Sequence, residues 1–229
     1  MTQRLSWAVL RRGRSLWSRN ATPGATVYGE ALRRIDGKEH RRWDPTRSKI
    51  GSALLRSKEP QRLLPEPGRT ALYLGAGHGT TISHLHDHLC GAGNHREGRL
   101  IAVDLAPRCM RDLTHLARQR PGIVPVLGDA RQHEAWAGLL PTRTPWMFQD
   151  VAQAAQADIF IAAALRFLEP GGIGILSLKG ASERFDAGEG SVFDGVASSL
   201  EAAGLEIDER ISLRGHEMHH EVFVCRTPV

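Results

Sequence analysis

Short apolar runs and segments of helical periodicity alternate along most of the chain. Residues 70–74 form a run typical of a buried strand, and Ile82, Leu85 and Leu89 then recur at the spacing of one helix face. Strands that alternate with helices in this way favour an α/β fold built on a parallel sheet. The same pattern predicts further strands over 99–104, 123–127, 144–150 and 173–178, and helices that begin at Pro107, Gln156 and Glu189.

The first 45 residues follow a different pattern, with short strand-like runs and frequent turn residues. Residues 4–10 and 15–18 flank the turn Arg11-Arg12-Gly13, which favours a hairpin. Two more short strands are predicted over 26–28 and 32–35, the second followed by the turn signal Asp36-Gly37. This pattern predicts a small antiparallel β unit.

A helix and a linker join this unit to the rest of the chain. Asp44 suits the cap and Pro45 the first turn of a helix whose apolar face holds Ile50, Ala53 and Leu54. A proline-rich linker follows over 60–68. We therefore expect two units: residues 1–58 as the N-terminal β unit with its connecting helix, and residues 59–229 as the main α/β domain.

The sequence also predicts how the main sheet ends on each side. Pro125 cannot donate to a neighbouring strand, so its strand is expected at an edge or in an irregular position. Strands predicted over 205–213 and 220–225 are separated by a loop too short for a helical crossover, so they must pair antiparallel. The expected fold is α/β: a Rossmann-like sheet, parallel with an antiparallel last strand, as in S-adenosylmethionine-dependent methyltransferases, plus the small antiparallel β unit.

The chain is basic, and its cations are unevenly distributed. Its 229 residues carry a formal net charge of +5, and only four of its 30 cationic side chains are lysines, which makes each lysine informative. Ten arginines precede residue 48. A surface rich in arginine can follow a phosphate backbone, but it can equally be an ordinary solvated surface. The sequence leaves these two interpretations open.

Cysteine usage and hydropathy exclude several classes of protein. Cys90, Cys109 and Cys225 lie far apart without CxxC spacing, so neither a disulfide framework nor a zinc site is expected, and a reduced cytoplasm fits. His216, His219 and His220 cluster, but no cysteine pair supports a metal site there. No apolar run approaches the ~18 residues of a membrane span, and we expect no signal peptide.

A glycine-rich turn lies between the strand over 70–74 and the helix that follows it. Glycines at 75, 77 and 79 let the backbone turn tightly and approach a ligand closely, although an ordinary strand-to-helix turn has the same composition. Asp104 ends the next strand, where a carboxylate can accept hydrogen bonds from a ribose. Asp129 ends the third strand, where it can bind an adenine amino group or cap a helix. Together these positions predict a nucleoside ligand.

Asp150 and Lys179 end the fourth and fifth strands of the sheet. An aspartate and a lysine on neighbouring strand ends can transfer protons or can form a structural ion pair. A lysine acts as a general base only when its pKa is lowered, which requires burial or a nearby second cation. The rarity of lysine in this chain favours the functional interpretation.

Several motifs together resemble the fibrillarin-like rRNA/tRNA 2′-O-methyltransferases of the archaeal type. These enzymes methylate RNA ribose within box C/D guide ribonucleoproteins. The similarity runs in order from the N-terminal hairpin to the final strand. Its motifs are Val27-Tyr28-Gly29-Glu30, Trp43-Asp44-Pro45-Thr46-Arg47-Ser48-Lys49, the glycine turn extended through Tyr73 to His84, Pro107-Arg108, Asp129-Ala130-Arg131 and Asp150-Val151-Ala152-Gln153.

The resemblance implies a cofactor, a set of site residues and several partners. It implies S-adenosyl-L-methionine as cofactor, with a guide RNA, a substrate RNA, a Nop-domain scaffold protein and a kink-turn-binding ribosomal-type protein as partners in an archaeal cytoplasm. It implies a catalytic set of Lys49, Asp150, Lys179 and His220. The cofactor-binding set that it implies is Gly75, Ala76, Gly77, Gly79, Thr80, Thr81, Asp104, Leu105, Asp129, Ala130, Asp150 and Gln153.

The chain departs from the family pattern at several positions. His78 stands where the family usually has a small residue, which predicts an altered cofactor pocket, and Pro145 interrupts the strand before Asp150. Two other functions stay open from the sequence: a stand-alone methyltransferase acting on a small molecule or a protein, and a catalytically silent RNA-binding subunit. The G-x-G-x-G turn argues against a nicotinamide dehydrogenase, because its spacing does not suit a pyrophosphate.

Overall fold

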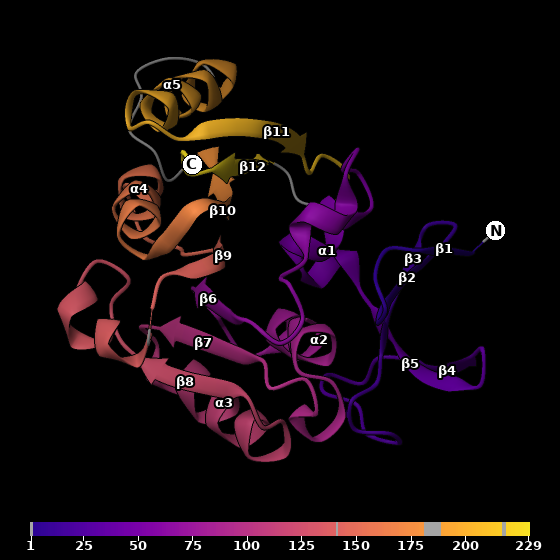
Figure 1. Cartoon of the computed structure of the whole chain (residues 1–229). Helices are drawn as coiled ribbons and strands as arrows, with labels where there is room; N and C mark the ends of the chain where they lie inside the picture. Colours follow the sequence, from indigo (N-terminus) through magenta and orange to yellow (C-terminus); the bar gives the residue numbers. More distant parts are fainter. Residues whose placement is uncertain (1, 141, 181–188, 217–218) are drawn as a thin grey trace.

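The structure is a computed structural model that describes residues 2–140, 142–180, 189–216 and 219–229, without the side chains of 189–191 (Figure 1). Its centre is a mixed sheet with two layers of helices. Within the described residues, no helix is both long enough and apolar enough to cross a membrane.

Seven strands of the described chain form the main sheet, in the order β11-β12-β10-β9-β6-β7-β8. All neighbours from β10 to β8 are parallel, whereas β12 pairs antiparallel with both β10 and β11. The predicted fold class is therefore confirmed, and β8, which contains Pro125, is an edge strand as predicted. The strands are β6 (Thr70–Leu74), β7 (Arg99–Asp104), β8 (Ile123–Leu127), β9 (Thr144–Gln149), β10 (Leu168–Lys179), β11 (Glu206–Ser212) and β12 (His220–Arg226).

The two faces of this sheet are covered by different helices. In β6, Ala71 and Tyr73 contribute to one apolar cluster with residues of α2 and α3, whereas Leu72 and Leu74 contribute to a second cluster with residues of α4 and α5. The central parallel strands, such as β6 and β9, bury both faces, as the strands of doubly wound sheets do. The covering helices are α2 (Thr80–Leu89), α3 (Pro107–Gln119), α4 (Gln156–Phe167) and α5 (Glu189–Ala202), with short 3-10 turns η3 (Ala92–Asn94), η4 (His133–Ala135) and η5 (Ala137–Leu139).

The N-terminal residues form a separate antiparallel sheet, which Figure 1 shows in indigo beyond α1 and α2. The predicted hairpin is present, although the strand expected over 4–10 is divided because the Ser6 hydroxyl accepts from the backbone N–H groups of Ala8 and Val9 and bends the chain. The strands are β1 (Thr2–Arg4), β2 (Val9–Arg12), β3 (Ser15–Arg19), β4 (Leu32–Ile35) and β5 (Lys38–Trp43), in the order β1-β2-β3-β5-β4.

The strand predicted over 26–28 is wrong. The Glu30 carboxylate accepts the backbone N–H groups of Val27 and Tyr28 at 2.8–3.1 Å, so these groups are not available to a neighbouring strand. A side chain that hydrogen-bonds nearby backbone groups competes directly with a β ladder. Apolar alternation alone did not indicate that Glu30 would do this.

The single helix predicted to begin at Pro45 is two helices. Asp44 caps the 3-10 turn η1 (Pro45–Arg47), then Ser48 takes an extended conformation (φ −152°) and caps α1 (Lys49–Leu54). A further turn, η2 (Pro60–Leu63), leads into β6. The division at residues 58 and 59 stays a prediction, since one apolar cluster contains Leu16 and Trp43 together with Tyr73.

Candidate active site

A cavity of about 780 Å³ opens at the carboxyl ends of the parallel strands β6, β7, β9 and β10. This is where open α/β sheets bind ligands, and the volume lies within the usual range of small-molecule sites. The structure brings most of the predicted site residues to this one cavity. They are Lys49, Gly75, Gly77, Asp104, Leu105, Ala130, Asp150, Gln153, Lys179 and His220.

The glycine loop is shaped by backbone conformations that favour glycine. Gly75 has φ +81°, and a Cβ there would collide with the carbonyl group of Asp150 at the end of β9. Gly77 has φ +60° and lines the cavity, and a Cβ there would meet no other atom within 4 Å. The loop therefore presents bare backbone to a ligand while it packs closely against the next strand.

Asp104 fixes this loop and still has capacity for a ligand. Its carboxylate accepts the backbone N–H of Gly77 at 2.7 Å and that of Ala106 at 2.8 Å. A carboxylate has about four lone-pair sites, so roughly two stay available for hydroxyl donors. Leu105, next to it, exposes 54% of its surface at the cavity, which suits contact with an apolar or aromatic group.

Asp129 does not line the cavity itself, but it hydrogen-bonds to Gln153, which does. Hydrogen bonds from the side chain of Arg131 lower the pKa of Asp129, and Gln153 donates to the same carboxylate at 3.1 Å. The carboxylate also accepts the backbone N–H of Arg131 at 2.9 Å, so it organises the local turn. Ala130 and Gln153 line the cavity in its place.

Four other residues of the predicted cofactor set also lie outside the cavity wall. Gly79 is the N-cap of α2, and the Thr81 hydroxyl donates to the Ser48 hydroxyl at 3.0 Å instead of facing the cavity. Ala76 is buried in the apolar cluster on the α2 side of the sheet, and Thr80 is the first residue of α2. These four residues shape the loop and its helix from outside the wall.

The predicted catalytic residues meet on the other side of the cavity. The Lys49 ammonium lies 3.6 Å from the Asp150 carboxylate, and the two side chains are 26% and 22% exposed. Burial raises the pKa of Asp150, although Lys49, His220 and Ser177 act in the opposite direction. Lys179 and His220 stand opposite each other in the β10–β12 pairing, so both face the same end of the sheet.

Two residues that the sequence did not single out support this arrangement. Gln156 is 2% exposed; its side chain accepts the backbone N–H of Lys179 at 3.0 Å and donates to the carbonyl of Val151 at 2.6 Å. Ser177 lines the cavity two residues before Lys179 on the same strand face. Strand periodicity could have indicated Ser177, whereas no local signal pointed to Gln156.

The structure places the His78 side chain against α3 and outside the cavity wall. The His78 side chain is 51% exposed and is not part of the cavity wall. Its Nδ1 lies 2.7 Å from the Asp112 carboxylate and its Nε2 lies 3.5 Å from the Cys109 sulfur, so it packs against α3.

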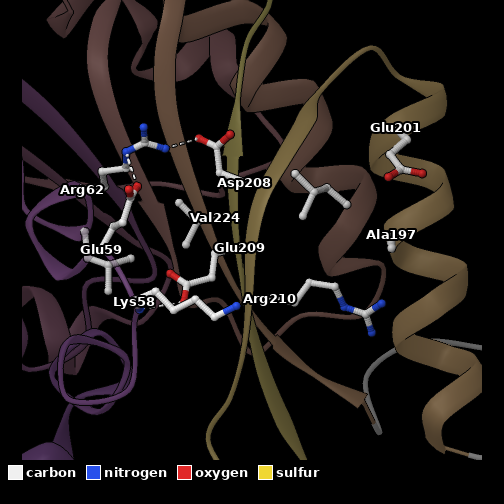
Figure 2. Close-up of a pocket in the computed structure, with 11 residues that line it drawn as sticks. Lys58, Glu59, Arg62, Ala197, Glu201, Asp208, Glu209, Arg210 and Val224 are labelled. Carbon is white, nitrogen blue, oxygen red and sulfur yellow. Dashed lines mark hydrogen bonds and ion pairs between the residues drawn. The ribbon is translucent and has the colours of Figure 1, made fainter.

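A second cavity, of about 640 Å³, lies between η2, the edge strand β11 and α5 (Figure 2). It contains none of the predicted site residues. Arg62 makes ion pairs there with Glu59 at 2.8 Å and Asp208 at 3.2 Å. Charged side chains along an edge strand discourage pairing with another chain, which is an adequate explanation for this surface.

Comparison with known proteins agrees with the geometry. The sequence model of the Fibrillarin family matches residues 6–228. The chain belongs to the fibrillarin family. It is 40% identical over 211 residues to the fibrillarin-like rRNA/tRNA 2′-O-methyltransferase of Thermococcus onnurineus, covering 92% of this chain and 89% of that protein.

Solved fibrillarin structures share the fold over nearly their whole length. The Methanococcus jannaschii fibrillarin pre-rRNA processing protein superposes with a TM-score of 0.87 at 28% identity, covering 99% of this chain and 97% of that one. The Aeropyrum pernix fibrillarin, solved with natively bound S-adenosyl-L-methionine, gives 0.80 at 33% identity, with 95% and 92% covered. A fibrillarin/Nop5p complex gives 0.81 at 29% identity, with 97% and 98% covered.

Proposed function

We propose that the chain is an S-adenosylmethionine-dependent methyltransferase that methylates the 2′-oxygen of ribose in rRNA and tRNA. The main support for this proposal is that one cavity has two sides lined by chemically different residues. The glycine loop and Asp104 form one side, and the Lys49–Asp150 pair with Lys179 and His220 forms the other. The names of the archaeal relatives and the cofactor of the Aeropyrum pernix protein support the same reaction.

The residues on the first side suit S-adenosylmethionine. The glycine loop, whose backbone is open at Gly77, would take the methionine part, and the remaining lone pairs of Asp104 would accept the ribose hydroxyls. Ala130 and Gln153, with Asp129 behind them, would contact the adenine. When bound, the cofactor supplies an electrophilic methyl group on a sulfonium sulfur.

The residues on the second side would handle the substrate hydroxyl. Lys179 would accept the hydroxyl proton as the 2′-oxygen takes up the methyl group, whose bond to the sulfonium sulfur would break in the same step. Asp150, whose carboxylate lies 3.6 Å from the Lys49 ammonium, would hold Lys49 beside the reacting oxygen. His220, which pairs with Lys179 across β10 and β12, would orient the groups beside it. Alignment of the two reactants is worth roughly 7–11 kcal/mol of barrier, so most of the catalysis would come from positioning.

We further propose that the chain works within a box C/D ribonucleoprotein of an archaeal cell. The fibrillarin/Nop5p complex supports a Nop-domain scaffold as one partner. A guide RNA would select the target by base pairing, and a kink-turn-binding protein would hold that RNA. In this arrangement the chain itself would need no sequence-specific reading of bases.

The replacement Lys179→Ala tests this function. We expect methyl transfer to a guided RNA to fall by roughly 100-fold to 10,000-fold, the usual contribution of general acid–base catalysis. Cofactor affinity, measured by calorimetry on the isolated chain, should change less than about threefold because the residue lies on the substrate side.

Lys38→Ala is the matched control, since it removes an exposed lysine of β5 that does not line the cavity. It should leave transfer unchanged. Retained transfer in Lys179→Ala would reject the assigned role. Efficient methylation of a small alcohol by the isolated chain, without RNA, would favour a stand-alone methyltransferase.

A further inference from the structure

Three basic side chains near the end of α1, outside the cavity, lie close enough for their charges to act on one another. Arg56 follows α1, Arg14 lies in the turn between β2 and β3, and His216 follows β11. Arg56 donates to the Ser52 hydroxyl at 2.9 Å, to the His216 Nδ1 at 2.8 Å and to the carbonyl of Arg214 at 3.0 Å. These contacts hold the Arg56 guanidinium and the His216 ring together.

The contact between Arg56 and His216 fixes the tautomer of the histidine. A guanidinium has only donors, so Nδ1 of His216 must accept and the ring proton must lie on Nε2. Within the described part of the chain, Nε2 makes no hydrogen bond. The cluster therefore presents two guanidinium groups and an imidazole N–H, and all three are donors.

Within the described structure, the two arginines of the cluster have no close counter-charge. Arg41, Arg62, Arg131, Arg210 and Arg226 each have a carboxylate within 4.0 Å, but among the described residues Arg14 and Arg56 have none. Burial lowers the pKa of His216, and the charges of Arg56 and Arg14 lower it further, although the charge of Asp44 acts in the opposite direction. The pKa of Arg56 is lowered by burial and then by Arg14, so these groups repel one another. An anion in the middle would remove that repulsion.

The cluster is connected to the catalytic side of the cavity by a single helix. Lys49, Ser52 and Arg56 lie at helical spacing along α1 and its last turn, so Arg56 is roughly 10 Å from Lys49 along the helix axis. His216 precedes His220, which lines the cavity at the start of β12. The cluster thus lies on the substrate side, away from the glycine loop.

We propose that Arg14, Arg56 and His216 form a phosphodiester-binding site that holds the substrate RNA strand a few nucleotides from the ribose being methylated. The proposal rests on the proposed function. Guanidinium forks bind phosphate oxygens through paired hydrogen bonds. Exposed Arg42 and Arg47 extend the positive surface past Asp44, whose pKa they help to lower, and this elongated surface favours a polyanion over a single carboxylate.

The test uses the full chain assembled with scaffold, guide RNA and kink-turn protein, and a synthetic RNA complementary to the guide. Arg14→Gln is the cleanest variant because Arg14 makes no hydrogen bond or ion pair in the described structure. We expect Arg14→Gln and Arg56→Gln each to raise the KM for RNA about tenfold, which corresponds to about 1.4 kcal/mol. The kcat at saturating RNA and the cofactor Kd of the isolated chain should not change.

The salt dependence of RNA binding separates a phosphate contact from a purely structural role. Each lost contact should reduce the slope of log K against log salt by roughly 0.7–0.9. Arg56→Lys should recover part of the affinity because it keeps the charge but not the fork. Arg118→Gln, an exposed arginine on α3, is the control and should leave KM and slope unchanged.

An unchanged KM and an unchanged slope in both glutamine variants would overturn the proposal. Weakened binding to the scaffold protein, with unchanged RNA affinity in complexes that do form, would assign the cluster to an acidic protein segment and would also overturn it. Failure of the proposed function looks different, because the unmodified chain itself would then transfer no methyl group to the guided RNA.

Discussion

At the scale of single residues, two aspartates show how surroundings decide the state of a carboxylate. Burial raises the pKa of Asp150, and the opposing charge of Lys49 at 3.6 Å does not fully offset it. Asp87 is also buried, but His86, Arg41 and Arg120 outweigh burial and lower its pKa to about 2. The fold therefore disfavours the charged form of Asp150, whereas it stabilises the charged form of Asp87.

Asp150→Asn should therefore abolish transfer without destabilising the fold. Because the folded chain binds the Asp150 proton more tightly than the unfolded chain does, this group's contribution to stability falls as pH rises above the ordinary aspartate value. Asparagine removes that cost, and we expect the free energy of unfolding at pH 7 to be unchanged or to rise by roughly 0.5–1 kcal/mol. Urea unfolding checks this. A loss of more than about 1 kcal/mol would mean that the Lys49 pair stabilises the fold.

We expect Gly75→Ala to affect mainly the stability of the fold and Gly77→Ala to affect mainly cofactor binding. Both positions have positive φ, which costs an alanine roughly 1–2 kcal/mol. Only at Gly75 would the Cβ also collide with the Asp150 carbonyl, so we expect about 1–3 kcal/mol more destabilisation there. Gly77→Ala should mainly weaken cofactor binding. Thermal unfolding and calorimetry separate the two effects, and equal unfolding temperatures would contradict the collision.

At the scale of elements, the break between η1 and α1 places a catalytic residue. The Ser48 hydroxyl accepts the backbone N–H of Gly51 at 3.1 Å and so begins α1 at Lys49. The same hydroxyl accepts from Thr81 at 3.0 Å, which joins α1 to the helix of the glycine loop. One side chain thus fixes the relative position of the element that carries Lys49 and the element that follows the cofactor loop.

Ser48→Ala should cost both stability and turnover. Loss of the cap destabilises a helix by about 1 kcal/mol, and the buried Thr81 hydroxyl loses its acceptor as well, so we expect about 1–2 kcal/mol in total. We expect kcat to fall while the cofactor Kd changes little. Asp44→Ala, which removes the cap of η1 only, is the control. A fall in cofactor affinity without a fall in kcat would contradict this role.

At the scale of the whole molecule, a buried charge network joins the N-terminal sheet to the main domain. Arg41 of β5 is fully buried and contacts Glu30 at 2.5 Å, Asp87 of α2 at 2.9 Å and the Ser83 hydroxyl at 2.8 Å. Arg120, at the end of α3, pairs with the same Asp87. Breaking a buried pair leaves an uncompensated charge, so this network makes the two sheets interdependent.

Asp87→Asn should destabilise the chain by roughly 3–5 kcal/mol at pH 7, because two buried guanidinium groups lose their shared anion. Since the pKa of Asp87 is about 2 in the folded state, its contribution is present above about pH 4 and is lost as pH falls toward 2. Urea unfolding from pH 7 to pH 2 should show the variant and the unmodified chain converging. Asp36→Asn, in an exposed pair with Arg4, should change stability by less than about 1 kcal/mol.

Much of the fold and half of the site follow from local sequence. The strand over 99–104, the helix from Pro107 and the edge position of the Pro125 strand depend on patterns within about 15 residues, and all three are confirmed. The strand predicted over Val27 and Tyr28 was wrong because their backbone N–H groups donate to the nearby Glu30 carboxylate instead of to a neighbouring strand. The position of His78 outside the cavity goes with its contacts to Asp112 and Cys109 of α3, which lie 34 and 31 positions further along the chain.

By itself, the sequence determined the order of the elements and which side chains stand at the strand ends. Parallel strands end at one edge, so Asp104, Asp150 and Lys179 had to meet there whatever the details of packing. Only the tertiary structure decided which groups touch. Three of these contacts join residues that are 33 to 160 positions apart: the Lys49–Asp150 pair, the Ser48–Thr81 bond and the Arg56–His216 contact. Local sequence patterns cannot predict contacts between residues so far apart in the chain. Burial, which raises the pKa of Asp150, is likewise a property of the assembled fold.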